Sequence, residues 1–219
     1  MILRLQTSCD VRRREAFADF CGSYWRPLYV LARGLGQNPH DAEDLVQGFI
    51  GELLARDDLG PLSPERGRMR TFLKVAFRHH LVDNIRREKA QRRGGGEVLL
   101  SLDTREVERQ MAAGESPDLA YDRQWVRTIL ARSLERLRKK YSGEEKAALF
   151  AALEPCLTDA GPSAYAELAE KLGRTETALR AAVHRLREQY REALRAEVAD
   201  TLGPGEDAEA ELRLLMAVR

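Results

Sequence analysis

Apolar residues recur at helical spacing along most of the chain, and the clearest stretch starts at Asp41. From there, apolar side chains fall at the i, i+3, i+4 and i+7 positions of one stripe. They are Ala42, Leu45, Val46, Phe49, Ile50, Leu53 and Leu54. This spacing predicts an amphipathic helix over residues 41–56. Asn38 and Pro39 precede it, and they suit a helix cap and a first helical turn.

The opposite face of this predicted helix is polar and begins with acidic residues. It holds Asp41, Asp44, Gln47 and Gly51, and Glu43 adds a further carboxylate to the first turn. Acidic residues there complement the positive end of the helix dipole, and such charges are usually solvated. The alternative is a surface for a basic partner, and the flanking segments bear on that choice.

Two further helices flank this one in the first half of the chain. The first is predicted over residues 14–35, with Pro27 expected to kink or divide it. The second is predicted over residues 71–92 and carries two apolar-leaning stripes, as if it packed between two neighbours. One stripe is Phe72, Val75, His79 and Val82, and the other is Leu73, Phe77 and Leu81.

The segment from Arg66 to Arg93 is strongly basic, with ten Lys or Arg residues against two Asp or Glu. Arg70, Lys74 and Arg78 form a line at i+4 spacing within it. A solvated face rarely needs so large a local excess of positive charge. The phosphate backbone of nucleic acid is the commonest partner of such a segment.

The second half of the chain starts near Asp118, after three glycines at 94–96 and a polar stretch that predicts a tether. Near its end, two helices with a short turn between them are predicted at 164–172 and 176–198. Thr175 is the N-cap candidate of the second helix. One face of that helix is a basic stripe of Arg180, His184, Arg187 and Arg191.

Such a pair of helices has two interpretations. In a DNA-binding helix-turn-helix, the second helix lies in the major groove and its first residues meet the edges of the bases. In a plain helical hairpin, the same basic stripe is only a solvated face.

The chain ends in an acidic tail after Gly203, Pro204 and Gly205. Four apolar residues in the tail are spaced as on one face of a short amphipathic helix. They are Ala208, Leu212, Leu215 and Met216. Such a helix could dock on its own domain or offer a surface to a regulator.

Composition narrows the class of protein. The chain has 219 residues, of which 6% are aromatic and 32% charged, as is typical of helical proteins. Its net charge is only +1, so the positive charge is local. No apolar run is long enough to cross a bilayer or to act as a signal peptide. These features predict a cytoplasmic protein without membrane insertion.

No pattern of residues points to catalysis. The sequence shows no nucleophile with a base, no glycine-rich phosphate loop and no cluster of metal ligands, so neither an enzyme nor a cofactor is expected. His79 and His80 are adjacent, and because neighbouring helical residues point about 100° apart, the pair cannot chelate one metal ion from one face. Cys9, Cys21 and Cys156 lie far apart and show no CxxC spacing.

Three segments together resemble one family. The run Asp41-Ala-Glu-Asp-Leu-Val-Gln, followed by Phe49 and Leu53-Leu54, resembles the polymerase-binding helix of bacterial sigma factors of the extracytoplasmic-function (ECF) class. Residues 70–87 resemble the promoter-melting helix of that class, and residues 165–187 resemble its C-terminal helix-turn-helix. The resemblance covers roughly residues 14–92 and 118–200, in the family's order and spacing.

The resemblance implies an all-α fold with two small helical domains joined by a linker. The first domain would be 1–93, the linker 94–117, the second domain with its helix-turn-helix 118–202, and the tail 203–219. It also implies a sigma factor, without catalysis of its own, that binds core RNA polymerase and directs promoter recognition and DNA opening. Besides the polymerase and promoter DNA, an anti-sigma factor or other regulatory protein is the family's usual partner.

Site residues carry over from the matching positions. For polymerase binding they are Asp41, Glu43, Asp44 and Gln47. At the −10 promoter element, where a base must leave the stack, the expected phosphate contacts are Arg68, Arg70, Lys74, Arg78, Arg86 and Arg87. At the −35 element the expected contacts are Thr175, Glu176, Thr177, Arg180, His184 and Arg187.

The sequence departs from the family's usual pattern at several positions. Phe72 stands where the family usually has Trp, and His79 where it often has Asn. Ala182 occupies a commonly basic position of the recognition helix, which leaves the −35 sequence unspecified. The alternative function is a stand-alone helix-turn-helix regulator that does not join the polymerase. Residues 41–56 would then form a dimer or ligand surface.

Overall fold

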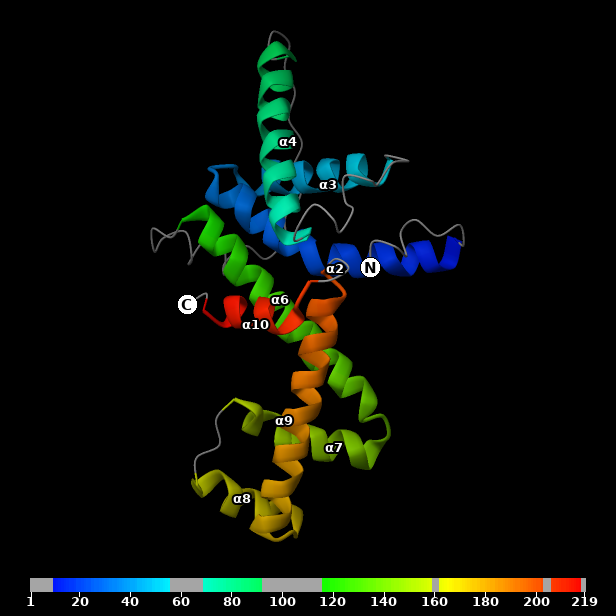
Figure 1. Cartoon of the computed structure of the whole chain (residues 1–219), viewed down its shortest axis with the longest axis vertical. Coiled ribbons are helices and arrows are strands. Elements are labelled where there is room, and N and C mark those ends of the chain that lie inside the picture. The colour runs from blue at the N-terminus through cyan, green and yellow to red at the C-terminus, as the bar shows by residue number, and fades with distance from the viewer. Residues whose placement is uncertain (1–9, 56–68, 92–115, 159–161, 203–205, 218–219) are drawn as a thin grey trace. The chain divides into compact units, whose positions relative to one another are not determined.

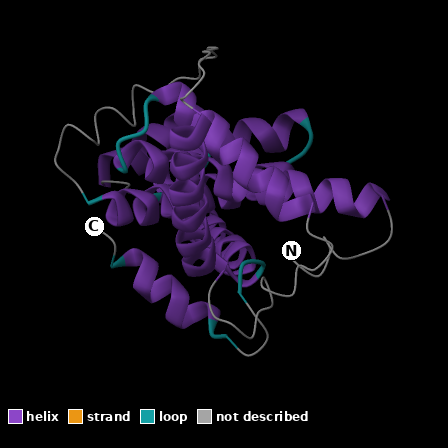
Figure 2. Ribbon diagram, turned by 90° about the horizontal axis from the view of Figure 1, so that it is seen from above, coloured by secondary structure: helices purple, strands orange, loops and turns teal. Residues whose placement is uncertain are grey.

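The described part of the chain is helical throughout. The computed structural model describes residues 10–55, 69–91, 116–158, 162–202 and 206–217, without the side chains of 10–16, 54, 88–91 and 162–164. Every regular element in these ranges is a helix (Figure 2), which confirms the predicted all-α class. None of the described helices is long and apolar enough to span a membrane.

The chain forms two compact units. Unit 1 comprises residues 1–128 and 198–219, and unit 2 comprises residues 129–197. Each boundary falls inside a long helix, namely α6 (Pro117–Lys140) and α9 (Glu176–Ala199). The start of α6 and the end of the chain therefore belong to the same unit as the first helices. The functional domains expected at 1–93 and 118–202 divide the chain differently and stay a prediction.

Unit 1 is built around three helices that pack together, α2 (Asp10–Gly34), α3 (Pro39–Ala55) and α4 (Met69–Gln91) (Figure 1). In α2, Pro27 does not divide the helix, contrary to one of the two expectations. A helix-interior proline costs about 3 kcal/mol, whereas burying one large apolar side chain contributes about 1.5–3 kcal/mol. Four fully buried side chains lie on either side of Pro27 in the helix, namely Phe20, Tyr24, Leu28 and Leu31. Their burial together outweighs the cost of the proline, so the helix continues through it.

The connection from α2 to α3 depends on Gly36, whose φ of 90° favours a residue without Cβ. The Gly36 N–H donates to the Arg33 carbonyl at 3.0 Å, and the Gln37 N–H donates to the Ala32 carbonyl at 3.2 Å. This pair of bonds is a Schellman motif, which satisfies carbonyls at the end of the helix. The turn brings α3 back against α2.

The predicted stripe of α3 is buried. All its described side chains are at most 5% exposed, and that of Leu54 lies outside the described residues. In α4 only one of the two predicted stripes is buried, namely Leu73, Phe77 and Leu81. Val75 and Val82 of the other stripe are 49% and 44% exposed. The α4 helix does pack against several neighbours, as predicted, since it contacts α2, α3 and α6. The second stripe does not make this packing, because its residues other than the half-buried Phe72 are exposed.

Unit 1 is completed by the start of α6 and by α10 (Ala208–Met216), the helix predicted for the tail. Asp207 caps α10, its Oδ1 accepting a hydrogen bond from the Glu209 N–H at 2.8 Å. Tyr121 and Trp125 of α6 and Leu215 of α10 are buried. The tail helix thus docks on its own unit, which was one of the two expectations.

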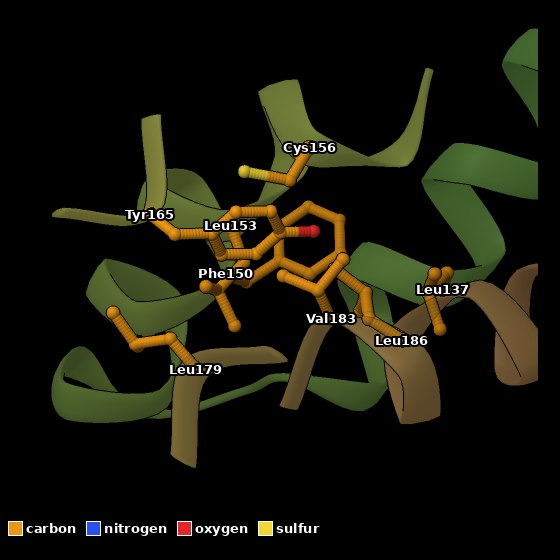
Figure 3. Packing of buried hydrophobic residues seen from close by; sticks show 8 residues of the cluster. All are labelled: Leu137, Phe150, Leu153, Cys156, Tyr165, Leu179, Val183 and Leu186. Atoms are coloured by element: carbon orange, nitrogen blue, oxygen red, sulfur yellow. The ribbon is translucent and has the colours of Figure 1, made fainter. Parts of the chain in front are cut away.

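Unit 2 combines the end of α6 with α7 (Glu144–Leu153), the 3-10 helix η3 (Glu154–Leu157), α8 (Pro162–Leu172) and most of α9. Gly173, at φ 60°, lies in the turn between α8 and α9. The core side chains of unit 2 turn toward one another (Figure 3). They are Leu137, Phe150, Leu153, Cys156, Tyr165, Leu179, Val183 and Leu186.

Replacing Leu73 with Ala should destabilise unit 1 by about 2–5 kcal/mol, because the side chain is fully buried and its loss leaves a cavity. Val75→Ala on the exposed face of the same helix should change stability by less than about 0.5 kcal/mol. Both tryptophans, Trp25 and Trp125, belong to unit 1, so urea unfolding followed by tryptophan fluorescence reports on this unit. Equal midpoints for the two variants would contradict the assignment of the buried face.

Candidate functional site

The start of α3 presents an acidic surface. Asn38 caps the helix as predicted, since its Oδ1 accepts from the Asp41 N–H at 2.9 Å and its Nδ2 donates to Asp41 Oδ2 at 2.6 Å. This reciprocal pair fixes the first turn, as a capping box does. Asp41, Asp44 and Gln47 are exposed, and the Asp44 side chain retains 67% of its accessible surface. Three of the four predicted polymerase contacts therefore share one open surface.

Glu43, the fourth predicted contact, is placed differently and is only 4% exposed. It precedes Val46 by three residues and Ile50 by seven, and both of these are buried. Glu43 therefore lies on the inward stripe of α3. This spacing was visible in the sequence and separates Glu43 from the outward carboxylates.

Two glycines continue the exposed surface of α3 beyond Gln47. A Cβ built on Gly51 would meet nothing within 4 Å, and one on Gly48 would make only an ordinary contact with His80 at 3.7 Å. Glycine inside a helix costs roughly 0.5–1 kcal/mol relative to alanine. Nothing within the described residues requires glycine at these two positions, and together they leave a flat, side-chain-free strip.

The basic line of α4, defined as Arg70, Lys74 and Arg78, faces the start of α6 within unit 1. Arg70 Nη1 lies 3.0 Å from Asp122 Oδ1, and Lys74 Nζ lies 3.1 Å from Asp122 Oδ2. Asp118 then pairs with Lys74 at 3.5 Å and with Arg78 at 3.0 Å. The i+4 line of cations on one helix thus meets an i+4 pair of carboxylates that runs in the opposite direction.

Arg70 is the most enclosed member of the basic line, with its side chain 11% exposed. Its guanidinium lies over the ring of Trp125 at 5.4 Å, and its Nη2 donates to Glu211 Oε1 of α10 at 2.9 Å. The Tyr121 hydroxyl donates to the Arg70 carbonyl at 3.1 Å. Burial raises the pKa of Tyr121 well above its ordinary value, so the hydroxyl keeps the proton that it donates.

The outward face of α4 consists of Phe72, Val75, His79, Val82 and Arg86. All but Phe72, which is half-buried, are exposed. Beside this face a pocket of ≈ 230 Å³ lies between α3 and α4, and Phe72, His79 and His80 are among its lining residues.

Charged side chains flank the pocket and the outward face. Glu52 pairs with His80 at 3.1 Å and with Arg87 at 3.4 Å, and Asp83 pairs with Arg86 at 3.4 Å. Both arginines remain more than half exposed. Of the predicted −10 contacts, Arg86 and Arg87 are thus open, and Arg70 and Lys74 are covered. The Arg78 side chain is 41% exposed beside Asp118, and Arg68 lies outside the described residues.

In unit 2 the start of α9 is exposed. The predicted cap is confirmed, because Thr175 Oγ1 accepts from the Ala178 N–H at 3.3 Å. Glu176, Thr177 and His184 are exposed. Arg180 lies over the ring of Tyr165 at 4.4 Å and within 3.4 Å of Glu176. The ring holds the guanidinium plane in place.

Arg187, the last predicted −35 contact, is used inside unit 2. Its Nε and Nη2 both donate to the carbonyl oxygen of Cys156, at 3.1 and 2.7 Å. It therefore satisfies a carbonyl of η3, and burial raises the pKa of the adjacent Cys156 thiol. Sequence spacing placed Arg187 on the basic stripe but could not show that η3 folds back onto it.

Comparison with known proteins decides the family. A family model described as ECF sigma factor matches residues 44–196, well over half of the chain. The chain belongs to the ECF sigma factor family. No curated protein and no solved structure matched it. The match begins within the acidic surface of α3 and ends before α10.

Membership of the family settles the general role. The sigma factor is a DNA-binding protein of transcription that works with RNA polymerase, and sigma factors as a class are not enzymes. The described surfaces can therefore be considered as those of a sigma factor.

Arg187→Ala in this sigma factor should destabilise unit 2 by about 1–3 kcal/mol, because the part-buried Cys156 carbonyl loses both of its donors. Arg185→Ala, an exposed neighbour on α9, serves as the control and should be neutral. Hydrogen exchange of the amides in 150–158 and 179–190 would measure the effect locally. If both variants exchange like the parent, the Arg187 bonds contribute nothing to the fold.

Proposed function

We propose that this ECF sigma factor binds core RNA polymerase through the start of α3, opens the −10 element over the outward face of α4, and recognises the −35 element with the start of α9. The observation that supports this division most directly is the contrast between two open surfaces of unit 1. One is acidic and smooth, on α3, and the other is mixed apolar and basic, on α4.

The surface of α3 fits a basic helical partner. Asp41, Asp44 and Gln47 provide the charge and hydrogen-bonding groups, and opposite charges mainly speed encounter and fix orientation. Gly48 and Gly51 leave room for another backbone to approach closely. Neither glycine is required by the described packing, so a partner's approach is a physical reason for both.

The outward face of α4 fits single-stranded DNA. Opening a duplex takes a base out of the stack, at a cost of a few kcal/mol. Unstacked bases bind to aromatic and apolar side chains, and nearby cations hold the backbone. Phe72, His79 and the adjoining pocket offer the first kind of group, and Arg86 and Arg87 offer the second.

The start of α9 fits duplex DNA. Thr175, Glu176 and Thr177 lie exposed at the helix N-terminus, where a recognition helix meets base edges. Arg180 and His184 follow on the same exposed side, one and two turns further along. We retain these five residues as −35 contacts and place Arg187 outside the interface.

Mixed with core polymerase and a library of promoters, the protein should give transcripts that start only in its presence. Asp44→Lys should weaken binding to core polymerase roughly tenfold or more, because it sets like charges against each other. Glu192→Lys, the same charge change at an exposed position of α9, should leave binding unchanged. A stand-alone regulator would instead bind DNA and yield no polymerase-dependent transcripts.

Gly51→Ala should separate folding from polymerase binding. The isolated protein should gain up to about 1 kcal/mol of stability, because alanine is the better helix former and the site is open. Binding to core polymerase should weaken, since the new methyl group stands where the partner approaches. Ala148→Gly, at an exposed position of α7, makes the reverse change away from the surface and should lower stability alone. Equal or tighter binding by Gly51→Ala would contradict the proposed approach.

A further inference from the structure

Carboxylates of the chain itself are paired with the basic line of α4. Asp118 and Asp122 lie along it from α6, and Glu211 reaches Arg70 from α10. The side chains of Arg70 and Lys74 are only 11% and 17% exposed. A phosphate cannot reach either cation unless a carboxylate first moves away.

Carboxylate and phosphate groups compete for the same N–H donors of a guanidinium. Both offer oxygens that accept paired N–H donors from its planar fork. Arg70 uses Nη1 for Asp122 and Nη2 for Glu211, each at hydrogen-bond distance. The two carboxylates therefore occupy the directions from which a DNA phosphate would bind.

The α10 helix, which carries Glu211, is suited to undock from unit 1. α10 has only nine residues, and isolated helices of that length are marginal in water. It holds to unit 1 through Leu215 and Glu211, while Leu214 and Met216 are 48% and 68% exposed. Because Glu211 is 2% exposed in place, it regains water only when the helix moves.

We propose that Glu211 on α10, together with Asp122 on α6, forms an intramolecular lock that keeps DNA phosphates off Arg70 in the free protein. α10 is the part of the lock that opens. The proposal rests on the proposed function of α4 in DNA binding and adds Arg70, on the face beside the outward one, as a DNA contact that is regulated. Undocking of α10 frees Arg70 Nη2, which Glu211 otherwise holds. By linkage, DNA that binds the freed Arg70 must favour the undocked state of α10, and undocking must favour DNA binding to the same degree.

The first test removes one carboxylate charge without changing its shape. Full-length Glu211→Gln should bind a labelled single-stranded DNA 20-mer of mixed sequence roughly tenfold more tightly than the parent, since the apparent affinity rises with the fraction of open protein. The dependence of binding on salt should also steepen, because one more cation, Arg70, meets phosphate. Glu192→Gln, the same change at an exposed site in α9, is the control and should bind like the parent.

A double variant shows whether the gain acts through the lock. Arg70→Ala combined with Glu211→Gln should lose most of the added affinity and salt dependence. Unchanged binding by Glu211→Gln, or a gain that survives the loss of Arg70, would overturn the lock.

The second test needs no substitution and so does not depend on how a variant folds. Amide hydrogen exchange of residues 208–216 is measured in the parent protein, alone and saturated with the same DNA. Exchange should speed up on binding, because α10 undocks. Exchange that stays equal or slows would show that DNA binds with α10 in place, and would overturn the proposal.

Failure of the lock and failure of the proposed role in initiation give different results. If the parent starts polymerase-dependent transcripts but both tests of the lock are negative, the sigma-factor assignment stands and the two carboxylates are only structural. If the lock tests are positive but no transcripts form, the lock stands as control of a DNA-binding surface, and the proposed role in initiation fails.

Discussion

A guanidinium held against a buried aromatic side chain must be matched by carboxylates, and in unit 1 this requirement joins helices from distant parts of the chain. Arg70 lies over Trp125, and its two terminal nitrogens reach Asp122 and Glu211. Leaving a buried charge without its partner costs several kcal/mol. The pairs therefore specify how α4, α6 and α10 meet, and they explain why the start of α6 and the tail belong to the same compact unit as the first helices.

The same constraint divides α4 into three faces. Leu73, Phe77 and Leu81 face the core, and the basic line faces the carboxylates of α6. The remaining face, with Val75 and Val82 exposed, is left without a described neighbour. Because Arg70 and Lys74 are paired within unit 1, the face that α4 leaves to solvent carries apolar groups and exposed ion pairs. That surface suits unstacked bases more than a duplex backbone.

In α3 the helix cap and the helical period decide which polar side chains are exposed. Its first turn is fixed by the reciprocal bonds between Asn38 and Asp41, so the exposed Asp44 and Gln47 project from a rigid helix start. Glu43, the residue before Asp44, points into the interior of unit 1 because of the helical period. In a sigma factor this places charge on one side of the helix and leaves the glycine strip beside it unobstructed. Preorganisation of this sort lowers the entropy lost when a partner binds.

The sequence determined whatever depends on local periodicity and capping. The helices, the buried stripe from Ala42 to Leu53, the caps at Asn38 and Thr175, and the resemblance to ECF sigma factors all follow from neighbours within a few turns. Tertiary structure alone decided which cations remain open. Arg70 and Lys74 are covered by carboxylates some 50 positions or more away in sequence, and Arg187 by a carbonyl 31 positions away. A repeat of charges on one helix carries no information about what folds against it, because that partner is chosen by long-range packing.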